Sequence, residues 1–168
     1  MKTLYLIRHA KSSWDYPELT DFERPLNKRG KRDAPYMGQL LADMKVKPEL
    51  IISSPALRAY YTARIIAGRI GYPFDEIETA ESIYKSDAGE LIELIQLVED
   101  EYNSLMLFGH NPALTQTSNY LSDKHLDNIP TCGIVCIEFK TETWKEIKPD
   151  NGKFVFFEYP KKYFGKKK

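Results

Sequence analysis

The amino-acid sequence predicts an α/β fold: a three-layer α/β/α sandwich in which a mostly parallel sheet carries helices on both faces. Short apolar runs of strand length alternate along the chain with longer segments of helical periodicity. This alternation is typical of parallel sheets, whose strands are joined by crossover helices. With 168 residues, the chain is long enough for one core and too short for two. We therefore expect one domain over residues 1–160 and a disordered basic tail over residues 161–168.

The first half of the chain contains two expected helices. A polar loop follows the first strand, and a helix begins near Asn27. The second helix is expected to open with Ser54 as its N-cap and Pro55 at its first position, and to stop at Gly71 and Pro73. The strands expected in this half comprise residues 3–7, 50–52 and, more weakly, 74–77.

The second half contains two further helices. Asp87 with Glu90 three residues later forms a capping-box pattern, and one apolar face follows it. A strand over residues 105–108 delivers His110, and Asn111 with Pro112 caps the next helix. The strands expected at the end of the chain comprise residues 133–139 and 153–159, with a weaker one over 144–147 between them.

Composition excludes several classes of function. Lysine plus arginine and aspartate plus glutamate each total 24, so the formal net charge is zero. Such a chain gives no sign of a nucleic-acid or membrane partner, and any anion site must be local. The apolar stretch before Arg8 is too short for a secretory signal or a membrane span, and no later run is long enough. We therefore expect a soluble cytoplasmic protein.

The two cysteines, Cys132 and Cys136, lie four positions apart in one predicted strand. That spacing separates their Cα atoms by roughly 13 Å, which is too far for a disulfide between them. No histidine lies beside them to complete a zinc site. We expect two packed, reduced thiols.

Two of the expected strands end in histidine. His9 follows the first strand and His110 a later one, and open α/β folds place their ligands at the carboxyl edge where such strand ends meet. Three arginines are expected nearby: Arg8 beside His9, Arg58 at the start of the second helix, and Arg24 in the loop before the first helix. Guanidiniums match phosphate oxygens, and three of them suffice for a phosphoryl group of charge about −2. The pattern predicts phosphoryl transfer through imidazole.

One histidine must act as the nucleophile, and His9 is the candidate. The charge of Arg8 opposes a second positive charge and so favours the neutral His9 ring. A carbonyl or similar acceptor should hold one ring nitrogen while the other attacks phosphorus. His110 would donate hydrogen bonds to the oxygens of the transferring group. This scheme requires no metal and no cofactor.

Four motifs in order give the sequence a family resemblance. IRHAKSSW resembles the RHG or RHA signature of the histidine phosphatase superfamily, which includes cofactor-dependent phosphoglycerate mutases and acid phosphatases. SSPALRAYYTA resembles its second motif and GHNP its third. With RPLNKRG and IPTCGIV, the pattern is most similar to the small SixA-like phosphohistidine phosphatases, over nearly the whole chain. The resemblance implies that His9 is phosphorylated in turnover, that Arg8, Arg24 and Arg58 bind phosphate, and that His110 is the second catalytic histidine.

One loop departs from the sugar-phosphate members of this superfamily. Many of them place a glutamate acid in the loop before the helix that here starts near Asp87, and this loop reads AESIYKSDAGE. Glu81 is either that acid or a solvated residue, and Asp87 is more simply an N-cap. A phosphoramidate leaves readily once its imidazole nitrogen is protonated, so it needs a dedicated acid less than an alkoxide does. The short chain leaves little sequence for a lid, which favours an open pocket.

Three functions follow from these motifs. The first is a phosphatase that hydrolyses phosphohistidine on a protein through a phospho-His9 intermediate. The second keeps the nucleophile but acts on a small phosphomonoester, with Glu81 as the acid. The third is a phosphoprotein-binding module without turnover, which the four intact residues Arg8, His9, Arg58 and His110 disfavour.

Several residues near the motifs have a second interpretation. Arg29 or Arg32 competes with Arg24, because all three lie in one basic segment. Asp21 and Asp15 either orient an arginine or are solvated, and the solvated state is preferred. The remaining expectations concern His125 as an exposed loop residue, Trp14 and Tyr16 as pocket-mouth or packing residues, and the KKYFGKKK tail as a solubilising segment or a dock for acidic phosphoproteins.

Overall fold

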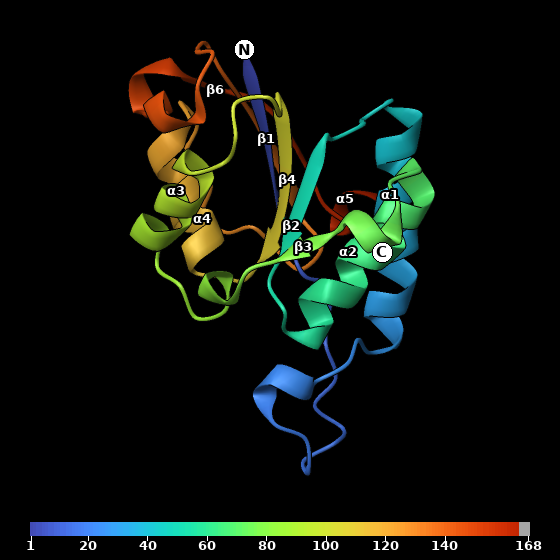
Figure 1. Ribbon diagram of the computed structural model, residues 1–168. Coiled ribbons are helices and arrows are strands. Elements are labelled where there is room, and N and C mark those ends of the chain that lie inside the picture. The colour runs from blue at the N-terminus through green and yellow to red at the C-terminus, as the bar shows by residue number, and fades with distance from the viewer. Residues whose placement is uncertain (165–168) are drawn as a thin grey trace.

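The computed structural model describes residues 1–164 and contains a six-stranded sheet with helices on both faces (Figure 1). The strands are β1 (Lys2–Arg8), β2 (Leu50–Ser53), β3 (Glu78–Thr79), β4 (Ser104–Gly109), β5 (Ile134–Phe139) and β6 (Gly152–Glu158). Their order across the sheet is β3-β2-β4-β1-β5-β6. The predicted α/β class is confirmed.

The sheet is mixed rather than uniformly parallel. β1, β2, β3 and β4 pair in parallel, whereas β5 is antiparallel to both β1 and β6. The segment between β5 and β6 contains only short 3₁₀ turns and no crossover helix. Antiparallel neighbours need no crossover, so the last two strands extend one edge of the sheet directly.

Two layers of helices enclose the sheet. The helices are α1 (Lys28–Asp43), α2 (Leu57–Ile70), α3 (Ala88–Gln96), α4 (Ala113–Leu121) and the short α5 (Lys161–Phe164). α1 and α2 cover one face and α3 and α4 the other, as Figure 1 shows. Each face has its own buried apolar cluster, and the central strands contribute to both because their side chains alternate between faces. No helix in residues 1–164 is long and apolar enough to cross a membrane.

Two of the predicted helix starts are confirmed. The Asn27 side chain accepts a hydrogen bond from the Gly30 N–H, and Asp87 with Glu90 forms a reciprocal capping box. The predicted Ser54 cap is wrong, because α2 begins three residues later, at Leu57. The Ser54 hydroxyl instead accepts from the Ala56 N–H, closing a turn ahead of the helix.

Three further segments differ from the predictions. Residues 74–77 form a 3₁₀ turn. The strand that follows it, β3, consists of only two residues, and both are exposed. The segment near Trp144 is also a 3₁₀ turn, held where the Trp144 backbone donates to Asp100 and the indole to the Tyr102 carbonyl. The start of the predicted disordered tail forms α5, because Phe164 packs on Tyr36. Residues 165–168 lie outside the described part.

The carboxyl ends of β1, β2 and β4 lie together at one edge of the sheet. The His9 N–H donates to the Gly109 carbonyl, and the Ser54 N–H donates to the Phe108 carbonyl. The long segment between β1 and α1 projects beyond this edge in Figure 1. Cys132 and Cys136 are buried free thiols, as expected.

Candidate active site

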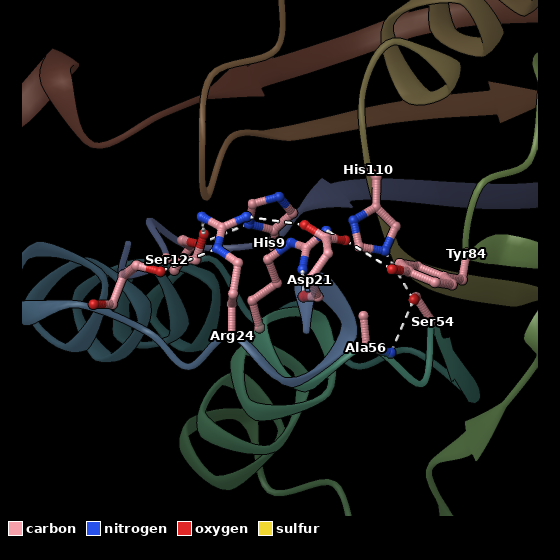
Figure 2. A network of polar contacts seen from close by, with 11 residues as sticks. His9, Ser12, Asp21, Arg24, Ser54, Ala56, Tyr84 and His110 are labelled. Atoms are coloured by element: carbon pink, nitrogen blue, oxygen red, sulfur yellow. Dashed lines mark hydrogen bonds and ion pairs between the residues drawn. The ribbon is translucent and has the colours of Figure 1, made fainter. Parts of the chain in front are cut away.

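The two histidines that follow β1 and β4 lie side by side at this edge (Figure 2). The ring centroids of His9 and His110 are 5.3 Å apart, with an interplanar angle of 51°. The register explains this proximity, because Arg8 pairs with Gly109 across the two parallel strands. The residues that follow therefore emerge next to each other, although they are far apart in the sequence.

The His9 ring is held in one tautomer. Its Nδ1 lies 2.7 Å from the Ala10 carbonyl oxygen, which can only accept, so Nδ1 carries the proton and Nε2 keeps its lone pair. Burial lowers the pKa of His9 to about 3, although the Ala10 carbonyl works in the opposite direction. The charge of Arg8, predicted to be the cause, contributes less than burial and less than the charges of His110 and Arg58. The ring is neutral at pH 7.

The His110 ring is held by a hydrogen bond with Ser54. Its Nε2 lies 2.8 Å from the Ser54 hydroxyl, and burial lowers the pKa of His110 to about 4, with the charge of Arg58 adding to the shift. The Nδ1 of His110 is buried and has no hydrogen-bond partner among the described residues. Buried polar atoms are nearly always paired, so this unpartnered nitrogen is a candidate contact for a ligand of the site.

Arg58 and Arg24 meet at one carboxylate, that of Asp21. Arg58 donates to the Asp21 backbone carbonyl at 2.7 Å and to its Oδ2 at 3.0 Å, while Arg24 donates to Oδ1 at 3.1 Å. Burial raises the pKa of Asp21, but hydrogen bonds from Tyr84 and Arg58 outweigh it and lower the pKa to about 2. The expectation of a merely solvated Asp21 is wrong, because these partners hold its carboxylate in the network of Figure 2.

Arg24 is fixed along its whole guanidinium. Its Nε donates to the Ser13 carbonyl at 3.0 Å, and one terminal nitrogen donates to the Ser12 hydroxyl at 2.6 Å. The Trp14 ring covers the guanidinium face at 3.3 Å, although the Trp14 residue is 75% exposed. Trp14 thus borders the site through its stacking on Arg24.

Tyr84 forms a wall beside His110. Its hydroxyl donates to Asp21 Oδ2 at 2.7 Å. Its ring meets His110 edge-on at 5.7 Å between centroids and packs against Phe22 at 5.2 Å. The tyrosine therefore ties the loop before α3 to the loop before α1.

The third predicted arginine lies next to His9. One terminal nitrogen of Arg8 donates to the Ile129 carbonyl at 3.1 Å, while its Nε is buried and unpartnered within residues 1–164. A hydroxyl bridge steadies the turn after it: Thr62 accepts from the Ala10 N–H and donates to the Arg58 carbonyl. The turn that carries His9 is thereby fixed to α2.

Other predicted residues lie outside this network. Glu81 is exposed, and its carboxylate makes no hydrogen bond or ion pair in the described part of the chain. Arg29 and Arg32 approach the buried Asp33 at 3.8 and 2.7 Å instead of competing with Arg24 at Asp21. The residues that the structure places on the surface, or in a capping role alone, are Asp15, Tyr16, His125 and Asp87.

The sequence matches the model of a known protein family. A model of the histidine phosphatase superfamily (branch 1) matches residues 4–94, which is more than half of the chain. The chain belongs to the histidine phosphatase superfamily. An uncharacterized chloroplastic protein of Arabidopsis thaliana is 30% identical over 153 residues, covering 86% of this chain and 70% of that protein.

Two further similarities connect this histidine phosphatase to named proteins. A 2,3-bisphosphoglycerate-dependent phosphoglycerate mutase of Rhizobium rhizogenes is 33% identical over 91 residues, covering 53% of this chain and 43% of the mutase. The crystal structure of SixA from Agrobacterium tumefaciens superposes with a TM-score of 0.81 and 27% identity, covering 95% of this chain and 98% of SixA. The chain is a SixA-like histidine phosphatase, and these findings support phosphatase activity.

Two residues of the candidate site, Ser54 and Tyr84, are not predicted from the sequence. The sequence predicts a helix cap at Ser54, but its position directly after a buried strand is the signal that places it at the same edge as His9 and His110. Tyr84 has no local signal, because only the folded loop brings it to Asp21. Within residues 1–164, no group of three His, Cys, Asp or Glu side chains is placed to hold a metal ion.

Proposed function

We propose that the protein is a phosphohistidine phosphatase that acts through a phosphorylated His9. The observation that carries this proposal is the neutral His9 ring, which keeps Nε2 unprotonated and whose centroid lies 5.3 Å from that of His110. An imidazole with a fixed proton on Nδ1 is a competent nucleophile toward phosphorus. Arg8, Arg24 and Arg58 are the proposed ligands of the phosphoryl oxygens.

In the first step, the Nε2 lone pair of His9 attacks phosphorus and the P–N bond of the substrate breaks. The leaving imidazole keeps the bonding pair and departs neutral, because solvent has already protonated its other ring nitrogen. The phosphorylated His9 ring is cationic, and its Nδ1–H bond to the Ala10 carbonyl stabilises that charge.

In the second step, a water molecule attacks phosphorus and the P–Nε2 bond breaks. Nε2 regains its lone pair, and the proton of the water passes to a phosphate oxygen, so that inorganic phosphate leaves. We propose that the Ser54 hydroxyl, 2.8 Å from Nε2 of His110, donates to that nitrogen, so that the proton of the His110 ring lies on the unpartnered Nδ1. That N–H is the proposed donor to the phosphoryl oxygens in both steps.

The site favours a phosphoramidate over an ester because it lacks a protonated carboxyl among the described residues. Asp21, the carboxylate in the network, has a pKa lowered to about 2 and is ionised, so it cannot donate a proton. Glu81 is exposed and unpaired. An alkoxide leaving group needs such an acid, whereas a protonated imidazole does not. The likeness to SixA from Agrobacterium tumefaciens, which is described as a phosphohistidine phosphatase, supports the same choice.

The test compares a protein carrying phosphohistidine with a panel of small phosphomonoesters, for the wild type and Glu81→Gln. We expect kcat/KM for phosphohistidine to exceed that for the esters by about a hundredfold, and Glu81→Gln to change neither. Glu76→Gln is the matched control, because Glu76 is an exposed glutamate in the 3₁₀ turn before β3, whereas Glu81 follows that strand.

Two outcomes would replace this proposal. Preference for an ester, with activity lost in Glu81→Gln but kept in Glu76→Gln, would identify a small-molecule phosphomonoesterase. Binding of the phosphoprotein without release of phosphate would identify a binding module.

A further inference from the structure

A second cationic site shares Arg8 with the candidate active site. A cavity of about 310 Å³ is lined by five basic residues: Arg8, Lys11, Arg29, Arg32 and Lys161. They come from the end of β1 and the turn that follows it, the first turns of α1 and the start of α5. Three elements that are distant in the sequence thus direct cations toward one cavity.

The charge of this cavity is unusual for the molecule. The whole chain has equal numbers of acidic and basic residues, yet the one acidic residue of the lining is Asp33. Asp33 is buried, and Arg32 and Arg29 approach it from α1. One buried carboxylate cannot neutralise five basic residues, so the cavity has an excess of positive charge.

The walls also provide apolar surface. Phe164 lies in the lining and packs under the Arg32 guanidinium at 4.1 Å, and its ring meets Tyr36 at 4.8 Å. Pro130 and Pro160 complete this side of the cavity. A lining of cations, prolines and an aromatic ring fits carboxylates on aliphatic stems better than it fits an isolated phosphate.

Arg8 connects the cavity to the candidate active site. It lines the cavity and directly precedes His9. Its guanidinium donates to the Ile129 carbonyl, next to the Pro130 and Thr131 of the lining. A chain whose phosphorylated residue lies at His9 can therefore place its neighbouring residues in the cavity.

We propose that this cavity binds an acidic segment flanking the phosphohistidine of the protein substrate. This inference rests on the proposed function, which it extends from the phosphorylated residue to the sequence around it. The transferred phosphoryl group engages the arginines around His9, and the carboxylates of the flanking segment engage Lys11, Arg29 and Lys161. Such rim charges act mainly by steering the partner and raising the rate of association.

The test uses two phosphohistidine peptides of equal length, one flanked by glutamates and one by neutral residues. The variant is Lys161→Glu, because Lys161 is exposed and makes no ion pair in the described structure. Lys145→Glu is the matched control, an exposed lysine on the 3₁₀ turn that packs against α3, on the opposite face of the sheet. A small phosphorylated reporter without flanks measures the intact catalytic site.

We expect the wild type to prefer the acidic peptide. The kcat/KM for this peptide should fall about tenfold in Lys161→Glu and stay unchanged in Lys145→Glu. The neutral peptide and the reporter should be turned over equally by all three proteins. If the wild type does not distinguish the two peptides, or if Lys161→Glu slows both equally, the docking proposal is overturned.

A binding measurement separates this proposal from the proposed function. Fluorescence anisotropy with the unphosphorylated glutamate peptide should show binding that Lys161→Glu weakens and added salt abolishes. If that peptide binds but neither phosphopeptide is hydrolysed, the docking site stands and phosphohistidine hydrolysis falls. If the neutral phosphopeptide is hydrolysed as fast as the acidic one and the glutamate peptide does not bind, phosphohistidine hydrolysis stands and the docking site falls.

Discussion

The Asp21 carboxylate accepts a hydrogen bond from the Arg58 guanidinium at 3.0 Å, although the two residues belong to different elements. Asp21 lies in the 3₁₀ turn of the projecting segment, and Arg58 lies in the first turn of α2. Arg58 keeps further N–H groups for a phosphoryl oxygen, because the guanidinium has five donors. Asp21 therefore orients the arginine without using all of it.

Replacing Asp21 with asparagine should weaken phosphate binding. The substitution removes the charge and one of the two carboxylate oxygens, so Arg58 and Arg24 no longer share an ion-pair partner. We expect KM for the phosphorylated substrate to rise about tenfold, corresponding to about 1.4 kcal/mol, with a smaller change in kcat. Steady-state kinetics measures the division between the two constants. Glu18→Gln, exposed in the same segment, should leave both unchanged.

Arg24→Lys should also reduce affinity, because a lysine cannot reproduce the planar fork. Arg24 donates through three nitrogens and stacks on Trp14, whereas an ammonium group is a point charge. We expect the inhibition constant of inorganic phosphate to rise about tenfold to a hundredfold. An unchanged inhibition constant would remove Arg24 from the phosphate site. Arg64→Lys, an exposed arginine of α2, is the control.

Neither histidine of the site should titrate near neutral pH. Burial lowers the pKa of His9 to about 3 and that of His110 to about 4, so both rings stay neutral as the pH falls from 8 to 5. Side-chain NMR of ¹⁵N-labelled protein should show neutral rings down to pH 5, whereas a free histidine peptide titrates near 6.5. A ring of the pair that protonates near pH 6.5 would contradict the buried, pre-organised site.

The same shifts make a prediction for stability. Below about pH 6.5 these two histidines bind protons in the unfolded chain but not in the folded one. The free energy of unfolding should therefore fall as the pH drops from 6.5 toward 4. His9→Gln should show a shallower fall in urea titrations across this range, and an equal slope would argue against a neutral buried His9.

Gly30 permits the close contact that places the segment after His9 on α1. A Cβ at this position would overlap the Lys11 carbonyl oxygen. Gly30→Ala should destabilise the fold by about 3 kcal/mol and lower Tm by about 6 to 12 °C. Gly68→Ala in α2 should stabilise it by about 0.5 to 1 kcal/mol, because its Cβ meets only the Phe74 ring edge at 3.5 Å. Equal effects in thermal unfolding would contradict the contact.

Much of the sheet could be predicted because its strands are buried apolar runs. The strands that deliver His9 and His110 end where the sequence changes from apolar to polar, so their meeting at one edge followed from the rules of parallel sheets. The weak strands at 74–77 and 144–147 were wrong, because short mixed segments fit a 3₁₀ turn as well as a strand.

The histidines and arginines of the candidate site could be located from the sequence, but the residues that hydrogen-bond to them could not. Asp21, Ser54 and Tyr84 contact the site only through tertiary structure, and each has an ordinary local explanation in the sequence. The cause of the low pKa of His9 was also misjudged, because burial is a property of the fold and the charge of Arg8 is visible in the sequence.

His9 is the residue proposed to carry the phosphoryl group during turnover. Rapid acid-free quenching during turnover of a phosphohistidine substrate, followed by peptide mapping under alkaline conditions, locates the covalent phosphate. We predict a phosphoryl group on His9 in the wild type, and none in His9→Gln, which should also lose turnover. Phosphate found on His110, or turnover by His9→Gln at the wild-type rate, would contradict the account.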